Sequence, residues 1–252
     1  MDSLINKGID KYIVHSYEVD ASQKLKVSSL LKFFQESAGR HAESIGVGWN
    51  YLHEKGLFWA LSRISIEIDD RPEWEDEIAL VTWPKVNDNV FAYRDFLLFN
   101  SKDLCNPIVR ATSAWALLNI KTRRPQRIEL VASDIPLTST DHAIVEHPHK
   151  VDALSGTACN QAAGQVKYSD IDMNGHVNNV RYFDWIGDAY PYGHYLEKSI
   201  ARLDINFLNE ALLGDTYRVN MDAIGGDVYL NNVVREKDNK ELVRTRISWT
   251  KR

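Results

Sequence analysis

Apolar positions in the first half of the chain predict a single long helix among several strands. Val27, Leu30, Leu31, Phe34 and Ala38 fall at positions i, i+3, i+4, i+7 and i+11, which places them on one face of a helix. A strand-like segment precedes this helix, and four more follow it, separated by Pro, Gly, Asn and Asp. The predicted strands lie at residues 12–19, 58–68, 77–83, 90–99 and 107–120.

The second half of the chain repeats this order of elements, with its helix at about residues 177–190. The predicted strands of this half lie at residues 164–169, 199–208, 217–224, 228–236 and 242–251. Residues 121–160, between the two halves, lack periodicity and contain Pro125, Pro136 and Pro148, which is typical of a linker.

Sequence similarity between the halves indicates an internal duplication. The similar segments are residues 108–115 with 242–249, 63–66 with 202–205, and 27–33 with 177–183. We therefore predict two units, residues 1–145 and 161–252, joined by a linker at about residues 121–160. Each unit has one helix and successive strands, which favours an α+β fold with an antiparallel sheet wrapped around the helix. A parallel sheet would need several helices per unit.

The densest group of polar residues lies between a strand and the helix of the second half. If the backbone there is extended, Asp172, Asn174 and His176 project to the same side. A carboxylate, an amide and an imidazole near the N–H groups that begin a helix can activate water and stabilise an oxyanion. The alternative is a capping loop, which also uses Asp and Asn.

Comparison of the two halves favours a site over a capping loop. The match of residues 27–33 with 177–183 places Ser22, Lys24 and Lys26 opposite the three polar residues. A loop that served only the fold would need similar residues in both halves. We therefore expect the site in the second unit and a different role for the first.

The pattern Asp-x-Asn-x-His-Val-Asn-Asn-x-x-Tyr, from Asp172 to Tyr182, resembles the acyl-acyl-carrier-protein (acyl-ACP) thioesterases of plants and bacteria. Residues 59–63 and 110–115 of the first half are also similar to that family. Its members are double hotdog proteins, so the resemblance implies a tandem hotdog fold. It also implies a hydrolase that cleaves fatty acyl-ACP to free fatty acid and carrier protein, ending fatty acid synthesis.

The resemblance also implies the catalytic residues. The family's catalytic Asp, Asn and His fall on Asp172, Asn174 and His176, and its Glu falls on Glu210. Ala211 stands where plant members have a Cys, so a Cys–His nucleophile is not expected here. Either Asp172 or Glu210 acts as general base toward water, or Asp172 attacks the thioester directly. Neither route requires a cofactor or a metal.

The first unit, without the polar set, is expected to hold the acyl chain. Candidate residues on its helix are Leu31, Phe34 and Ala38, for which core packing is the alternative. The preferred chain length is not evident from the sequence.

Composition narrows the partners and the location. The 252 residues carry a net charge of −5, which does not suit a nucleic-acid-binding protein. An acidic carrier protein can still bind a local basic group, for which the candidates are Arg123, Arg124 and Arg127; a solvated loop is the alternative.

No apolar run approaches the roughly 20 residues of a membrane helix. The first residues do not resemble a secretory signal, so we expect a cytoplasmic protein with no membrane partner, compatible with a homodimer.

Two other functions of a hotdog fold remain open at this point. One is a thioesterase for coenzyme A esters or a dehydratase, and the other is an acyl-binding protein without activity. The complete polar set argues against the inactive protein. A dehydratase needs a different pairing of His and carboxylate, on the helix. Cys105 and Cys159 are too few for a disulfide framework or a four-cysteine zinc site, and we expect both to be structural or incidental.

Overall fold

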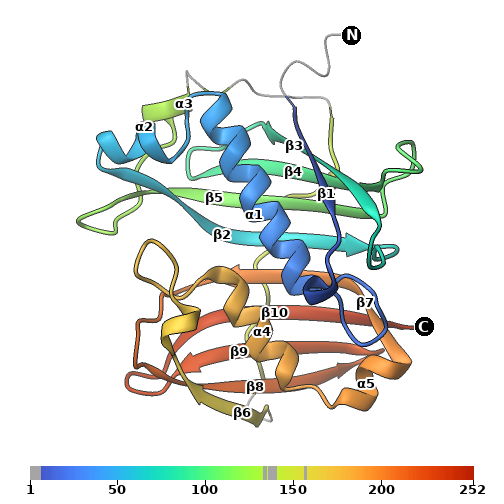
Figure 1. The fold of residues 1–252 in the computed structure, drawn as a ribbon. Coiled ribbons are helices and arrows are strands. Elements are labelled where there is room, and N and C mark those ends of the chain that lie inside the picture. The colour runs from blue at the N-terminus through green and yellow to red at the C-terminus, as the bar shows by residue number, and fades with distance from the viewer. Residues whose placement is uncertain (1–6, 133–134, 136–140, 156–157) are drawn as a thin grey trace. The chain divides into compact units, whose positions relative to one another are not determined.

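The computed structural model describes residues 7–132, 135, 141–155 and 158–252 and divides into two compact units, Met1–Pro148 and His149–Arg252. In each unit one helix lies across one face of an antiparallel sheet (Figure 1). The sheet order is β1-β3-β4-β5-β2 in the first unit and β6-β8-β9-β10-β7 in the second. The two orders are identical once the second is renumbered from one. This confirms the predicted duplication and the α+β fold of two hotdog units.

The first unit comprises β1 (Gly8–Ile13), α1 (Val27–Ser44), α2 (Trp49–Glu54), β2 (Leu57–Ile68), β3 (Glu77–Lys85), β4 (Phe91–Asn100), β5 (Val109–Asn119) and α3 (Glu129–Ala132). The second unit comprises β6 (Cys159–Gln165), α4 (Asn179–Asp188), α5 (Tyr192–Glu197), β7 (Lys198–Phe207), β8 (Thr216–Gly225), β9 (Val228–Arg235) and β10 (Lys240–Lys251). None of the helices within the described residues combines the length and the apolar character needed to cross a membrane.

The predicted first strand of each unit was wrong in position. The strand expected at 12–19 is β1, which ends at Ile13, and residues Ser16–Glu18 form a 3-10 helix. The strand expected at 164–169 is β6, which begins at Cys159, so this cysteine lies in a strand and not in the linker. Both strands are at sheet edges and largely exposed, so their sequences carry a weak apolar pattern.

Part of the predicted linker packs on the sheet of the first unit. The Ala143 N–H donates to the Asp95 carboxylate at 2.8 Å, and the Lys85 ammonium donates to the Ile144 carbonyl at 3.0 Å. Lys85 and Asp95 are buried and paired at 3.3 Å, so the linker backbone gives one hydrogen bond to each member of a buried ion pair. Residues 133–134, 136–140 and 156–157 of this linker, Pro136 included, lie outside the described residues.

Protonation of one buried histidine is expected to make the stability depend on pH. His41 is 6% exposed on α1, and its Nδ1 accepts a hydrogen bond from Arg94 at 2.9 Å. Burial and the Arg94 charge lower the pKa of His41 to about 4. The unfolded chain takes up this proton near pH 6.5, so stability is lost as the pH falls from there toward 4. The loss is roughly 3 kcal/mol by the size of the shift.

Urea unfolding at pH 7 and pH 4.5 measures this effect. In His41→Gln the amide oxygen still accepts from Arg94 but does not titrate, so the pH dependence in this range should be much weaker. An equal pH dependence in the two proteins would contradict the assignment to His41.

Candidate functional site

The segment with the predicted catalytic residues is a tight turn. Ile171 bridges to Val177, and the Asp172 N–H donates to the His176 carbonyl at 2.9 Å. The Asp172 carboxylate accepts the Asn174 N–H at 2.8 Å, which closes an Asx turn. Gly175 has a φ of +76°, which favours glycine. The predicted extended backbone is therefore wrong, and the alternation of side chains along a strand does not apply here.

Helix α4 begins after this turn. Asn178 is its N-cap, and its side chain accepts the Val180 N–H at 3.0 Å, so the helix starts two residues later than predicted. The Val177 N–H donates to the Ala211 carbonyl at 3.2 Å. The turn is thereby attached to the loop that follows β7, where Glu210 lies.

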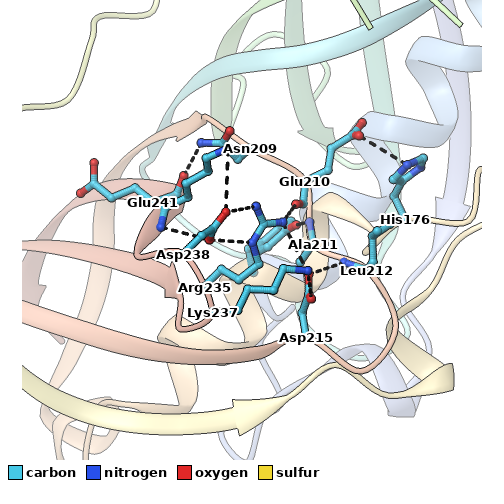
Figure 2. A network of polar contacts seen from close by, with 12 residues as sticks. His176, Asn209, Glu210, Ala211, Leu212, Asp215, Arg235, Lys237, Asp238 and Glu241 are labelled. Carbon is cyan, nitrogen blue, oxygen red and sulfur yellow. Dashed lines mark hydrogen bonds and ion pairs between the residues drawn. The ribbon is translucent and has the colours of Figure 1, made fainter. Parts of the chain in front are cut away.

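A side-chain contact joins two of the four predicted catalytic residues. Nε2 of His176 lies 3.4 Å from Oε2 of Glu210. Figure 2 shows the two side chains pointing toward each other. The His176 side chain is 23% exposed and the Glu210 side chain 48% exposed, so solvent and a substrate can reach the pair. Asp172 is half-buried and Asn174 exposed, both in the turn that carries His176. The four residues thus come from two loops that hydrogen bond to each other.

This arrangement has the groups needed for acid–base chemistry on water. An imidazole beside a carboxylate can pass a proton and hold the ring orientation. A carboxylate has two oxygens with about four acceptor sites, so Asp172 can hold the turn and still act on a water molecule. Among the described residues, no group of three or more His, Cys, Asp or Glu side chains is placed to bind a metal ion.

The first unit contains the same turn. Val19 bridges to Leu25, the Asp20 N–H donates to the Lys24 carbonyl at 2.9 Å, and the Asp20 carboxylate accepts the Ser22 N–H at 2.8 Å. These contacts match those of the second unit one for one.

The predicted correspondence between the units was therefore wrong by two residues. Asp20, Ser22 and Lys24 occupy the places of Asp172, Asn174 and His176. The earlier match aligned Val27 with Val177, but α1 starts at Val27 whereas α4 starts at Asn179. An aspartate thus begins the turn in both units, and it has a structural role in each.

What distinguishes the units is the residue opposite the turn. The Pro72 carbonyl accepts the Leu25 N–H at 2.8 Å, and the Ala211 carbonyl accepts the Val177 N–H in the same way. Pro72 therefore corresponds to Ala211. The residue before each, Arg71 in the first unit, then stands in the place of Glu210. The Arg71 guanidinium donates to Asp20 at 2.9 Å and neutralises that carboxylate. Only the second unit places an imidazole beside a carboxylate at this position, and this difference marks it as the candidate active site.

The candidate acyl-binding residues lie in the apolar layer between α1 and its sheet. Leu31, Phe34 and Ala38 are buried, and the Phe34 ring stacks on Phe96 with 4.7 Å between centroids. Burial is expected both for a pocket wall and for core packing, so their role stays a prediction.

The candidate docking arginines are exposed on the segment after β5. The Arg123 guanidinium lies 4.9 Å from the centre of the Phe58 ring, and Arg127 lies 4.0 Å from Glu129. Arg124 is exposed in the same turn as Arg123. Their role in binding a carrier protein also stays a prediction.

Two residues that contact the site were not predicted. The Tyr182 hydroxyl accepts the Ala211 N–H at 2.9 Å, and Arg235 donates to the Glu210 carbonyl at 2.9 Å. Tyr182 ends the recognised pattern, which is a signal in the sequence. Arg235 lies in a strand with no motif around it.

Comparisons with known proteins agree with this architecture. Residues 6–133 match the model for the acyl-ACP thioesterase N-terminal domain, and residues 155–251 match that for the C-terminal domain. A palmitoyl-acyl carrier protein thioesterase of Gossypium hirsutum, named as chloroplastic, is 28% identical over 94% of the chain. The chain spans 62% of that protein's length. The crystal structure of an acyl-ACP thioesterase from Bacteroides thetaiotaomicron is 27% identical, with a TM-score of 0.88, over 97% of this chain and 98% of that one.

Proposed function

Since the chain belongs to the acyl-ACP thioesterase family, we propose that it hydrolyses fatty acyl-ACP to a free fatty acid and the carrier protein, ending chain elongation. The observation that carries this proposal is the contact between His176 and Glu210 beside the Asp172 turn. Hydrolysis of a thioester needs an activated water molecule and a proton for the leaving thiolate, and this group of side chains can supply both.

In the first version of the mechanism a carboxylate acts on water. Glu210 or Asp172 takes a proton from a water molecule while the water oxygen bonds to the thioester carbon. The carbon–sulfur bond then breaks. His176 gives its proton to the departing thiolate, and Asn174 orients the water or the carbonyl. In the second version the Asp172 carboxylate attacks the carbon itself, the carbon–sulfur bond breaks, and His176 gives its proton to the thiolate; water then hydrolyses the resulting anhydride, which releases the fatty acid and restores Asp172. In both versions, the partial positive charge at the N-terminal end of α4 favours the oxyanion.

The acyl group is held by the first unit, near Leu31, Phe34 and Ala38. The carrier protein binds through Arg123, Arg124 and Arg127, whose positive charge complements an acidic surface. A cytoplasmic location and a homodimer belong to the proposal as well. Cell fractionation tests the location, and light scattering tests the assembly.

Hydrolysis assays with matched acyl-ACP and acyl-coenzyme A thioesters, across a range of chain lengths, test the proposed substrate. We expect a higher kcat/KM for the carrier-protein esters at every length that is turned over. Equal or better use of the coenzyme A esters would contradict the carrier-protein assignment, and no hydrolysis of either series would contradict the proposed reaction.

Enlarging the side chain at Ala38 is expected to shorten the preferred acyl chain. A phenyl ring in the layer between α1 and its sheet removes space from a tunnel there, so Ala38→Phe should turn over short chains nearly normally and long chains poorly. Overpacking also costs about 1–3 kcal/mol, so the chain-length profile is measured together with thermal unfolding. Ala42→Phe is the matched control, because Ala42 is buried one turn along α1 in a cluster with Val47 and Leu52. An unchanged profile in a stable Ala38→Phe protein would place the tunnel elsewhere.

Alkylation of the thiols is expected to leave turnover almost unchanged. Cys105 and Cys159 are both exposed, so a thiol reagent reaches both without unfolding. Neither lies in the turn or the loop that carries the four catalytic candidates. Turnover is compared before and after complete modification, confirmed by mass spectrometry. Strong inhibition would contradict a carboxylate mechanism.

A further inference from the structure

Arg235, the last residue of β9, is held firmly next to the loop that carries Glu210. Its side chain is 12% exposed, and it binds Asp238 through two hydrogen bonds of 3.0 and 2.7 Å. Its Nη1 atom lies 3.5 Å from Asp215 and donates to the Glu210 carbonyl at 2.9 Å (Figure 2). A guanidinium with two carboxylates on it has little freedom to turn away from this carbonyl.

We propose that Arg235 is a positioning residue, which fixes the backbone of Glu210 so that its carboxylate lies opposite His176. This role rests on the proposed hydrolysis, because it acts through Glu210. The Glu210 side chain is about half exposed and reaches His176 from a loop. The position of its backbone therefore decides where the carboxylate can reach.

The peptide that follows Glu210 is held by two more elements. The Ala211 N–H donates to the hydroxyl of Tyr182 on α4, and the Ala211 carbonyl accepts from Val177 in the catalytic turn. Together with Arg235 on β9, these contacts attach the Glu210 backbone to both the sheet and the helix of the second unit. A small displacement of this backbone would separate the carboxylate from the imidazole.

The carboxylates around Arg235 stay charged at neutral pH. The hydrogen bonds from Arg235 lower the pKa of Asp238 to about 2, and those from Lys237 and the Leu212 N–H lower the pKa of Asp215 despite its burial. The network therefore holds Arg235 at neutral pH and is lost only as the pH falls toward these lowered values.

The first unit separates the role of Arg235 from that of its neighbours. Asp76 accepts the Glu73 N–H at 2.9 Å and pairs with Lys102, just as Asp215 accepts the Leu212 N–H and pairs with Lys237. An aspartate and a lysine thus occur at these positions in both units, where they hold the equivalent loop of each unit.

Arginine at the end of the strand belongs to the second unit alone. Asn100 pairs with Ile78 in the first sheet, as Arg235 pairs with Tyr217 in the second, so Asn100 stands in the place of Arg235. Arg235 thus occurs in the unit that has Glu210. Asn100 occurs in the unit where Arg71 stands in the place of Glu210. This pattern is expected if Arg235 serves the carboxylate and not the fold.

The test uses Arg235→Gln and Arg235→Lys, with Lys237→Gln as the matched control. Lys237 pairs with the same Asp215 but is not bonded to the Glu210 carbonyl. We expect Arg235→Gln to lower kcat about 10- to 100-fold with little change in KM. A displacement of a catalytic group by about 1 Å can lower the rate by up to about 100-fold. Arg235→Lys should recover part of the loss, and Lys237→Gln should keep nearly full activity.

A double variant provides the readout that a general structural role would not change. In a Glu210→Gln background, Arg235→Gln should cause almost no further loss of kcat, because the carboxylate that it positions is already absent. An equal loss in both backgrounds, or normal kcat in Arg235→Gln, would overturn the inference.

A crystal structure of the Arg235→Gln variant tests the positioning role of Arg235 without an activity assay. We expect the separation of His176 and Glu210 to increase from 3.4 Å, or the Glu210 side chain to lose its defined position. An unchanged pair would overturn the inference even in an active enzyme. A wild-type protein that hydrolyses no acyl-ACP would instead overturn the proposed function, and the structure would still decide whether Arg235 positions Glu210.

Discussion

Asp172→Asn is expected to lower the turnover of acyl-ACP by a factor of about 10² to 10⁴, the contribution of a general base, without unfolding the protein. The asparagine side-chain oxygen can still accept the Asn174 N–H, so the turn should persist. The variant loses the negative charge that, in the proposed mechanism, takes a proton from water or attacks the thioester. Steady-state turnover and thermal unfolding, measured on the same preparation, check both halves of this expectation.

Asp172→Ala separates the structural role of this side chain from the chemical one. It removes the acceptor of the turn as well as the charge, so it should lose about 1 kcal/mol of stability in addition to activity. Asp170, two residues earlier, is unsuitable as a control. It is buried, accepts the Lys167 N–H at 2.8 Å and lies 3.5 Å from Arg181. A folded Asp172→Asn protein with near-normal turnover would contradict the catalytic assignment.

His176→Ala is expected to cost a factor of about 10² to 10³ in turnover, similar to the removal of one group that stabilises the oxyanion. The variant loses the imidazole that faces Glu210 and that, in the proposed mechanism, protonates the leaving thiolate. Lys24→Ala, at the matching position of the first unit, is the control and should keep near-normal turnover.

The pair of His176 and Glu210 is tested by a double-mutant cycle. If the two side chains act together, His176→Ala combined with Glu210→Gln should lose little more than the worse single variant. Losses that multiply would show that the two residues act independently, which would contradict a role for their contact.

The regular core elements could be predicted from sequence, because their burial imposes a periodic pattern. Helix α1 buries one face along its length, and the four strands that follow each helix lie close to their predicted ranges. The edge strands β1 and β6 are largely exposed, so their ends could not be predicted. Helices α2, α3 and α5 have four to six residues, too few to show a helical period.

The candidate site could be predicted in part. Asp172, Asn174, His176 and Glu210 carry a recognisable pattern, and the structure brings them onto two adjoining loops. The turn could not be predicted from alternation, because a side-chain hydrogen bond and the left-handed Gly175 determine it. Arg235 could not be predicted either, because its partner is the backbone carbonyl of a residue 25 positions earlier, and any residue type offers a carbonyl.

We assign hydrolysis to the second unit, although both units contain the same turn. The most direct test is the ratio of turnover between Asp20→Asn and Asp172→Asn, measured side by side on one acyl-ACP. Both substitutions remove a carboxylate that accepts an N–H in equivalent turns, at 2.8 Å in each unit. We predict near-normal turnover for Asp20→Asn and a ratio of at least about 10², set by the loss of a general base in the second unit alone. A ratio near one would contradict the assignment of the active site.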